Sequence, residues 1–253
     1  AFFIMNSKFP TKITPCPIIE SVVEIVYDRN LGIEPGAIYG KVYDELKLRY
    51  EKVESLPISQ LPEDLRLNDP KLKNKPWYKF SNELFEVLIG GSVLVIVAKK
   101  EYKGWTKYCE EINYVFNVFK KSNIFSSITK IGLKYVDLFE FPIINKIGIN
   151  IGSSLPINES LEIQFRSVIP EKYGLNGIVA VMNNITIEHL EEIKQNVSLL
   201  DIDVFKVYEA KDECKYEEAI KVLENAHKYQ KELFFNLVNE DFLVKNNFCV
   251  EKE

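Results

Sequence analysis

Two aspartates close together in the second half of the chain are the sharpest chemical feature of the sequence. Asp201 and Asp203 alternate with apolar residues in the segment Ser198–Tyr208. This alternation predicts a strand, on which residues two apart point to the same side at a spacing of roughly 7 Å. Two such carboxylates can hold Mg²⁺ with a third ligand from elsewhere, which suggests a metal-dependent hydrolase or nuclease. The alternative is that both side chains belong to the solvated face of an antiparallel strand.

A second pair of carboxylates lies near the N-terminus, in the predicted strand Ile19–Tyr27. Glu20 and Glu24 share the wetter face of this strand, but at strand rise they lie about 13 Å apart. That separation is too large for a bare carboxylate pair on one metal ion. We therefore keep both residues only as binding candidates on a solvated strand face.

The segment Ile128–Phe141 predicts the long central strand of the fold. Its odd positions from Ile131 onwards are apolar, whereas Lys130 and Lys134 lie on the other side. Asp137 interrupts the apolar face near the end, where a strand can run out into solvent or into a site. Lys130, Lys134 and Asp137 are the charged side chains within this strand, and we take them as binding candidates.

Two aromatic residues complete the set of binding candidates. Trp77 opens a predicted meander of three strands, and Tyr102 lies at the start of a predicted helix three residues before Trp105. The helical spacing predicts that this helix buries an apolar stripe of Trp105, Tyr108, Cys109, Ile112, Val115, Phe116 and Phe119, with Glu110, Glu111, Lys120 and Lys121 on the solvent side. Tryptophan and tyrosine are enriched at protein interfaces, although both also pack in cores.

The residue inventory argues against several kinds of chemistry. The chain has two histidines, His189 and His227, and four widely spaced cysteines without a CxxC pair. A histidine-rich metal site is excluded, and we predict no cofactor. There is no GxSxG motif for a serine hydrolase. A cysteine nucleophile paired with a distant histidine stays open, although nothing local supports it.

Composition and charge describe an ordinary globular chain with a mild acidic excess. The net charge of −5 over 253 residues argues against a general nucleic-acid binder, because phosphate contacts need a basic surface. No apolar stretch is long enough for a membrane span, and free cysteines suit a reducing compartment, so we expect a cytoplasmic protein. Met5 is a candidate natural start, which would make Ala1–Ile4 an upstream remnant.

The periodicity predicts an α+β fold with helices packed on one face of a largely antiparallel sheet. The expected order is β-α-β-β-β-α-β followed by β-β-β-α. Residues 54–76 contain four prolines among charged residues and predict a long irregular connection. Residues 190–197 predict a short helix or a charged hairpin tip.

We expect a single compact unit over residues 1–253. Residues 142–160 are rich in glycine, serine and proline, and they are the best candidate boundary between two sub-halves, 13–145 and 155–253.

Several motifs resemble those of a sporadically distributed prokaryotic family of uncharacterised proteins. The segment Pro17–Ile25 resembles its P-x-x-E-x-V-x-E-I opening, Tyr102-x-x-Trp105 its Y-x-x-W helix start, and Lys130–Tyr135 its [RK]-I-G-L-[RK]-Y strand. Where the family motif has arginines and an asparagine, this chain has Lys130, Lys134 and Asp137. The resemblance implies the extent of the fold and no activity.

Three functions therefore stay open at this point. The first is a binding, interaction or accessory module, for example one of immunity or defence, with a protein partner or a second copy of the chain. The second is the metal-dependent hydrolase that uses Asp201 and Asp203. The third is a small-ligand site between the C-terminal helix and the sheet.

Overall fold

The computed structural model describes residues 9–99, 102–149, 161–189, 192–209, 214 and 216–251. The Ala1–Ile4 segment and residues 150–160 of the candidate boundary lie outside these ranges. Contacts group the chain into two units. Unit 1 comprises Ala1–Ile19, Lys134–Val204 and Lys228–Glu253, and unit 2 comprises Glu20–Leu133 and Phe205–His227. Several strands and one helix contribute residues to both units, so each unit is described by itself.

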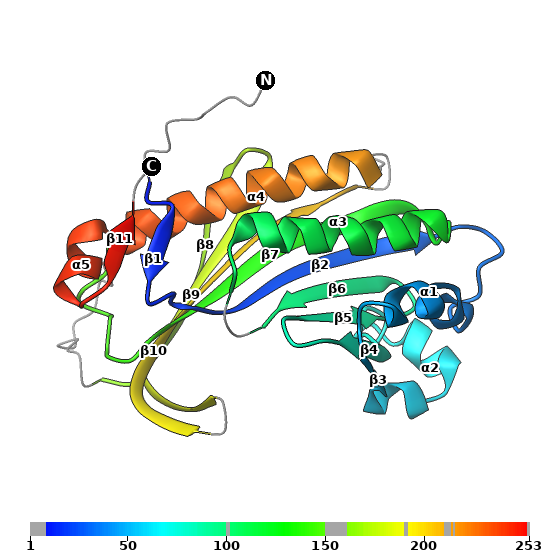
Figure 1. The fold of residues 1–253 in the computed structure, drawn as a ribbon, viewed down its shortest axis with the longest axis horizontal. Helices are drawn as coiled ribbons and strands as arrows, with labels where there is room; N and C mark the ends of the chain where they lie inside the picture. The colour runs from blue at the N-terminus through cyan, green and yellow to red at the C-terminus, as the bar shows by residue number, and fades with distance from the viewer. Residues whose placement is uncertain are drawn as a thin grey trace. The chain divides into compact units, whose positions relative to one another are not determined.

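The α+β class predicted from the sequence is confirmed (Figure 1). Up to the central strand, the elements are β1 (Lys12–Thr14), β2 (Ile18–Arg29), α1 (Ala37–Lys47), β3 (Lys52–Ser55), the 3₁₀ helix η1 (Pro57–Gln60), α2 (Glu63–Asn68), β4 (Tyr78–Ser81), β5 (Phe85–Ile89), β6 (Val93–Ala98), α3 (Trp105–Lys121) and β7 (Phe125–Phe139). They are followed by β8 (Ile163–Lys172), β9 (Leu175–His189), β10 (Glu192–Val207), α4 (Tyr216–Leu237), α5 (Glu240–Lys245) and β11 (Cys249–Glu251). None of the described helices combines the length and the apolarity that crossing a membrane would need.

The sheet of unit 2 has the strand order β3-β4-β5-β6-β2-β7. Its pairs β3/β4, β4/β5, β5/β6 and β2/β6 are antiparallel. The side chains on its inner face, including Val23, Ile25, Val87 and Ile96, are fully buried. The two-residue alternation of these strands therefore places a complete apolar layer on one side.

Helix α3 covers the inner face of this sheet (Figure 1). The hydroxyl of Tyr108 accepts a hydrogen bond from the Val23 N–H at 3.0 Å and donates to the Ile96 carbonyl at 2.6 Å. One side chain thus fixes α3 to both β2 and β6. Phe116 and Phe119 lie on the same buried stripe of the helix, as the sequence predicts.

Two residues of α3 depart from the prediction. Trp105, expected in the core, is only partly buried and stacks on the His227 ring with centroids 4.4 Å apart. Glu111, expected on the solvent side, is 5% exposed. It is buried because it pairs with residues of the segment that follows α1, which lie far away in the sequence.

The sheet of unit 1 has the order β7-β10-β9-β8, and β1 pairs with β11 in a separate antiparallel ribbon. Leu200, Ile202 and Phe139 are fully buried on the inner face. The odd positions of β7 are therefore the covered ones, as predicted. Asp201 and Asp203 lie half-buried on the opposite face of β10, also as predicted.

Residues 54–76 and 190–197 are two further regions in which the structure tests the prediction. Residues 54–76 contain the end of β3, then η1 and α2, and the prediction of a wholly irregular connection is wrong. Pro57 begins η1 and Pro62 precedes α2, which are helix-start positions that proline tolerates. For residues 190–197 the alternatives were a short helix and a charged hairpin tip. Strand β9 ends at His189 and its neighbour β10 begins at Glu192, so residues 192–197 are strand and not helix, while residues 190 and 191 lie outside the described part.

Candidate functional site

The outer face of unit 2's sheet carries apolar side chains where an antiparallel sheet normally carries polar ones. Val95 is the direct cross-strand neighbour of Glu24 on β2 and of Leu88 on β5. Val97 is in the same way flanked by Val22 and Glu86. We call the outward-facing Val22, Leu88, Val95 and Val97 the valine face.

All four residues of the valine face are half-buried, whereas their inward-facing strand neighbours are fully buried. Antiparallel strands with one wet side usually alternate apolar inward and polar outward residues. Here β6 reads Val93-Leu-Val-Ile-Val-Ala98, with no polar residue on either side. A contiguous apolar patch rimmed by polar residues is a feature of protein interaction sites.

Ion pairs frame the valine face on two sides, and we call them the charged rim. On one side the Lys130 ammonium lies 2.7 Å from the Glu24 carboxylate. On the other side Lys79 lies 2.7 Å from Glu54 and 3.9 Å from Glu86, and Lys99 lies 3.9 Å from Glu86. The rim has three lysines and three glutamates, so its formal charge is zero.

Hydrogen bonding orders one corner of the charged rim. The Lys79 ammonium donates to Glu54, which lowers the pKa of that carboxyl and raises the pKa of the lysine. Both groups are therefore fully charged near neutral pH. Since Glu54 is about half exposed, the pair adds little to stability and mainly presents ordered charges of both signs.

The end of the outer face near the β5–β6 turn is closed. Trp77 lies there with 1% exposure, beneath the Arg66 guanidinium, which is 3.9 Å from the ring centroid. The indole Nε1 has no hydrogen-bond partner among the described residues. Trp77 is thus a core residue that packs α2 onto the sheet, and its predicted place on a binding surface is corrected.

In unit 1, Lys134 and Asp201 form an ion pair with a separation of 3.5 Å. Burial raises the pKa of the Asp201 carboxyl, and Lys134 and Arg166 oppose this change. Among the residues described, no three His, Cys, Asp or Glu side chains gather closely enough to hold a metal ion. The metal-dependent hydrolase therefore stays a prediction without a described third ligand.

Asp137 lies on the inner face of β7, in line with Tyr135 and Phe139. It is 1% exposed, so the expectation that the strand runs out into solvent at this position is wrong, while Asp137 as a binding candidate stays a prediction. Its Oδ2 accepts no hydrogen bond from a described residue. Burial, with a smaller contribution from the charge of Asp201, raises the pKa of Asp137 to about 8.

The remaining two predicted candidates take part in none of these ion pairs. Glu20 is exposed on β2, on the same outward side as Val22 and Glu24, and Tyr102 is half-buried with its ring edge-on to Tyr108. The structure therefore brings Glu24 and Lys130 together in unit 2, and Lys134 and Asp201 together in unit 1. The sequence reasoning missed the valine face, although the unbroken apolar run of β6 was a usable signal.

Comparison with known proteins adds no relative: no protein-family model matches the chain, and neither does any curated protein. The motif resemblance to a prokaryotic family stays a prediction.

Proposed function

We propose that the chain is a protein-interaction module and that the valine face with its charged rim is the binding surface. The observation that carries this proposal is the outward, half-buried position of Val22, Leu88, Val95 and Val97. Covering these side chains removes apolar surface from water, which is the main driving force of association. The free cysteines suit a reducing compartment, and we propose the cytoplasm as its location.

The partner that this surface fits best is a second copy of the chain. A rim of zero formal charge with both signs on it does not attract a polyanion, and it does not repel its own copy. Two sheets can pack face to face about 10 Å apart, with the valines of each interdigitating about a two-fold axis. Because the patch is small compared with obligate interfaces, we expect a reversible dimer with a dissociation constant in the micromolar range.

Sedimentation equilibrium over a concentration series tests this proposal. The wild-type chain should shift from monomer to dimer, and Val95→Lys should stay monomeric. The new lysine lies opposite Glu24, which favours a folded monomer. The matched control is Leu48→Lys, because Leu48 is 84% exposed and lies outside the valine face.

Three outcomes contradict the proposal. The wild-type chain could remain monomeric up to roughly 200 µM, well above the expected range. Val95→Lys could dimerise as well as the wild type does while circular dichroism shows that it is folded. Leu48→Lys could abolish the dimer to the same degree, which would place the interface elsewhere.

A further inference from the structure

The buried carboxyl of Asp137 lies where α5 covers the end of β7. Asp137 shares the inner face of β7 with Phe139, whose ring packs edge-on against Phe242 of α5 and against Phe248, with centroids 5.8 and 6.1 Å apart. Phe248 directly precedes β11, which pairs with β1. We call α5, Phe248, β11 and β1 the ribbon cap. No residue of the cap belongs to the valine face, so the cap is independent of the proposed function.

The chain that follows β1 also approaches Asp137. The Pro17 carbonyl accepts a hydrogen bond from the N–H of Leu138, the residue after Asp137, at 2.8 Å. Burial raises the pKa of the Cys16 thiol, and the charge of Asp137 adds to this increase, so the two side chains lie within electrostatic reach. The ribbon cap and the start of β2 thus enclose Asp137, which is 1% exposed.

The enclosure provides no donor for the carboxylate. Oδ2 of Asp137 accepts no hydrogen bond from any residue within the described ranges. The charge that acts on Asp137 is that of Asp201 on β10, which has the same sign. The charged residues of α5 are not among its buried ones; they are Glu240, Asp241 and Lys245. A buried carboxylate without a donor or a counter-charge is unfavourable, so the closed cap favours the protonated carboxyl.

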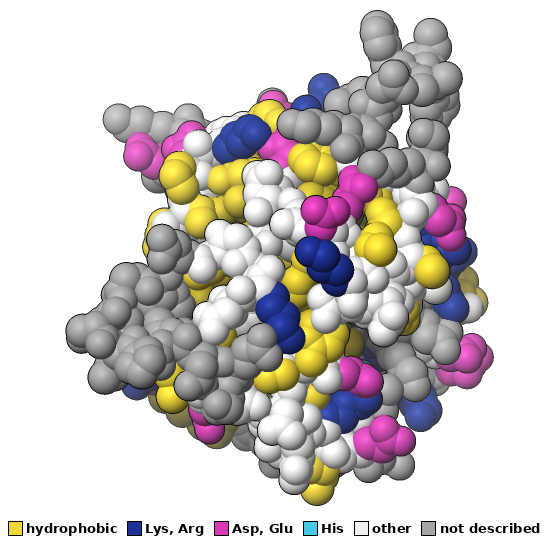
Figure 2. Space-filling model, turned by 90° about the vertical axis from the view of Figure 1, so that its left-hand side faces the viewer, with side chains coloured by type: hydrophobic (Ala, Val, Ile, Leu, Met, Phe, Trp, Pro, Cys, Tyr) yellow, Lys and Arg dark blue, Asp and Glu magenta, His cyan; other side chains and the backbone are white. Residues whose placement is uncertain are grey.

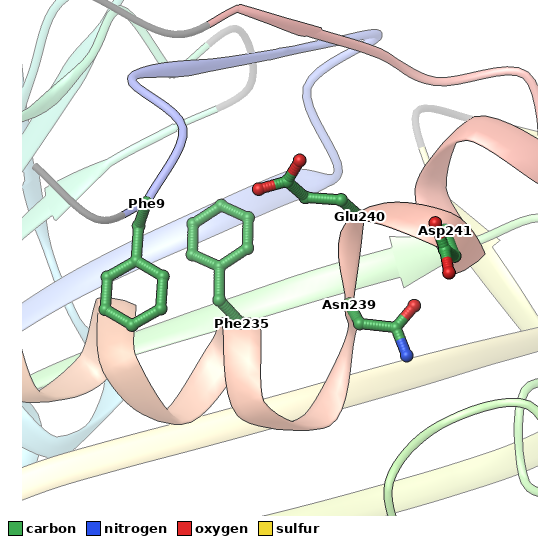
Figure 3. Close-up of a pocket in the computed structure, with 5 residues that line it drawn as sticks. All are labelled: Phe9, Phe235, Asn239, Glu240 and Asp241. Atoms are coloured by element: carbon green, nitrogen blue, oxygen red, sulfur yellow. The ribbon is translucent and has the colours of Figure 1, made fainter.

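Packing around α5 is incomplete. A pocket of about 390 Å³ lies beside this helix, and its lining residues are Phe9, Phe235, Asn239, Glu240 and Asp241 (Figure 3). Atoms that line a void lack contacts on one side. Strands β1 and β11 have three residues each and, among the described strands, pair only with each other. Few contacts and short strands are features of segments that open locally while the rest of the chain stays folded.

We propose that Asp137 makes the ribbon cap a proton-dependent switch, in which the cap is closed while the carboxyl is protonated and opens locally when the carboxyl releases its proton to water. In the closed state burial raises the pKa of Asp137 to about 8. In the open state the carboxyl is solvated and titrates at about pH 4. The equilibrium constant for opening therefore rises by up to about tenfold per pH unit between these two values and levels off above them.

Other groups of the cap keep their charge near neutral pH. Figure 2 shows charged side chains of both signs beside hydrophobic ones on the face that includes α5. Exposed carboxyl and ammonium groups titrate at about pH 4 and about pH 10, so their charges do not change between about pH 6 and about pH 8. A change in the cap over this interval therefore reports Asp137 or a thiol, and Cys249 on β11 is the exposed thiol of the cap.

Hydrogen–deuterium exchange measured by mass spectrometry at about pH 6 and about pH 8 tests the proposal. After correction for the intrinsic pH dependence of amide exchange, the protection of cap peptides in the wild-type chain should fall at least about tenfold. Peptides of α1 and α3 in unit 2 should keep their protection. Asp137→Asn, which cannot ionise, should remove the fall. Asp44→Asn at an exposed aspartate of α1 and Cys249→Ser in the cap should both retain it.

Four results overturn the proposal. Wild-type cap peptides could keep the same corrected protection at both pH values, a result that does not depend on any variant. A folded Asp137→Asn variant could lose as much protection as the wild type does. Cys249→Ser could abolish the loss, which would assign it to the thiol. Peptides of α1 and α3 could lose protection by the same factor as the cap, which would show unfolding of the whole chain instead of local opening.

Discussion

Both faces of unit 2's sheet carry valines, but in different surroundings. Val23 and Val87 on the inner face are fully buried, whereas Val22 and Val95 on the outer face are only half-buried. For these valines, the difference lies in what covers them and not in the residue type. The inner face is covered by the chain's own helix α3, and we propose that the outer face is covered by a partner.

The inner layers also differ in how they accommodate a carboxyl group. Glu111 on α3 accepts hydrogen bonds from the Arg49 guanidinium, at 2.7 Å, and from the Tyr50 hydroxyl. Asp137 in unit 1 is buried to a similar degree, but its Oδ2 has no donor among the described residues. A buried carboxylate with donors stabilises the fold, whereas one without donors is destabilised in its charged form.

The largest effect is expected where the inner face is covered. Phe116 is fully buried, so Phe116→Ala should lower the free energy of unfolding by about 3–5 kcal/mol. Trp105→Ala should cost clearly less, because Trp105 is only partly buried. Urea denaturation of both variants measures the difference. Equal losses would mean that Trp105 is as much a core residue as Phe116.

The second prediction concerns pH. The pKa of Asp137 is raised from 3.8 to about 8 in the folded chain, so folding takes up a proton between these values. The contribution of Asp137 to the free energy of unfolding should therefore be most favourable below about pH 4 and fall by up to about 1.4 kcal/mol per pH unit toward pH 8. Asp137→Asn removes this dependence and should be the more stable protein at pH 8, with little difference at pH 4.

Urea unfolding at a series of pH values checks the Asp137 prediction. The decisive quantity is the slope of the free energy of unfolding against pH. Asparagine and a protonated aspartate are nearly equal in size, so a change in this slope reports the loss of the titrating group. If wild type and Asp137→Asn show the same slope between about pH 4 and pH 8, Asp137 is ionised in the folded chain and must have a donor.

A smaller effect is expected at Glu111, the buried carboxylate that has hydrogen-bond donors. Glu111→Ala leaves Tyr50 without its acceptor and Arg49 without its ion pair. The cost should be about 2 kcal/mol, because the Arg49 side chain is 45% exposed and can be solvated by water. Thermal unfolding measures it, and Glu111→Gln, which keeps an acceptor for Tyr50, should lose less. A Glu111→Ala variant as stable as wild type would remove the contrast with Asp137.

The smallest effect on stability is expected on the outer face. Val95→Lys should change the free energy of unfolding of the monomer by less than about 1 kcal/mol, although it should abolish dimerisation. The measurement is urea unfolding at a concentration low enough to keep the wild type monomeric. A loss as large as that of Phe116→Ala would show that Val95 belongs to the core.

Much of the fold follows from local sequence pattern. The alternation of β7 predicted which of its faces is buried, and the helical spacing of Tyr108, Phe116 and Phe119 predicted the packed stripe of α3. These patterns lie within single elements, and their periodicity indicates which side of the element is apolar. They do not report which apolar side is covered, and for this reason the valine face was predicted only as strand.

Individual residues show what a local sequence pattern cannot predict. Glu111 was placed in solvent because its partners, Arg49 and Tyr50, lie about sixty residues away. Trp77 was predicted as a surface candidate because no residue near it in the sequence indicates that the Arg66 guanidinium covers its ring. In both cases the deciding contact is long-range, and its register is set by how elements pack.

Concentration-dependent NMR of valine methyl groups tests the central claim most directly, because it compares the two faces within one sample. On dilution, the methyl resonances of Val22, Val95 and Val97 should move as the dimer dissociates. Those of the inward-facing Val23 and Val87 should stay in place. If inner and outer methyl groups move alike, or if none moves across the micromolar range, the valine face is not the interaction surface.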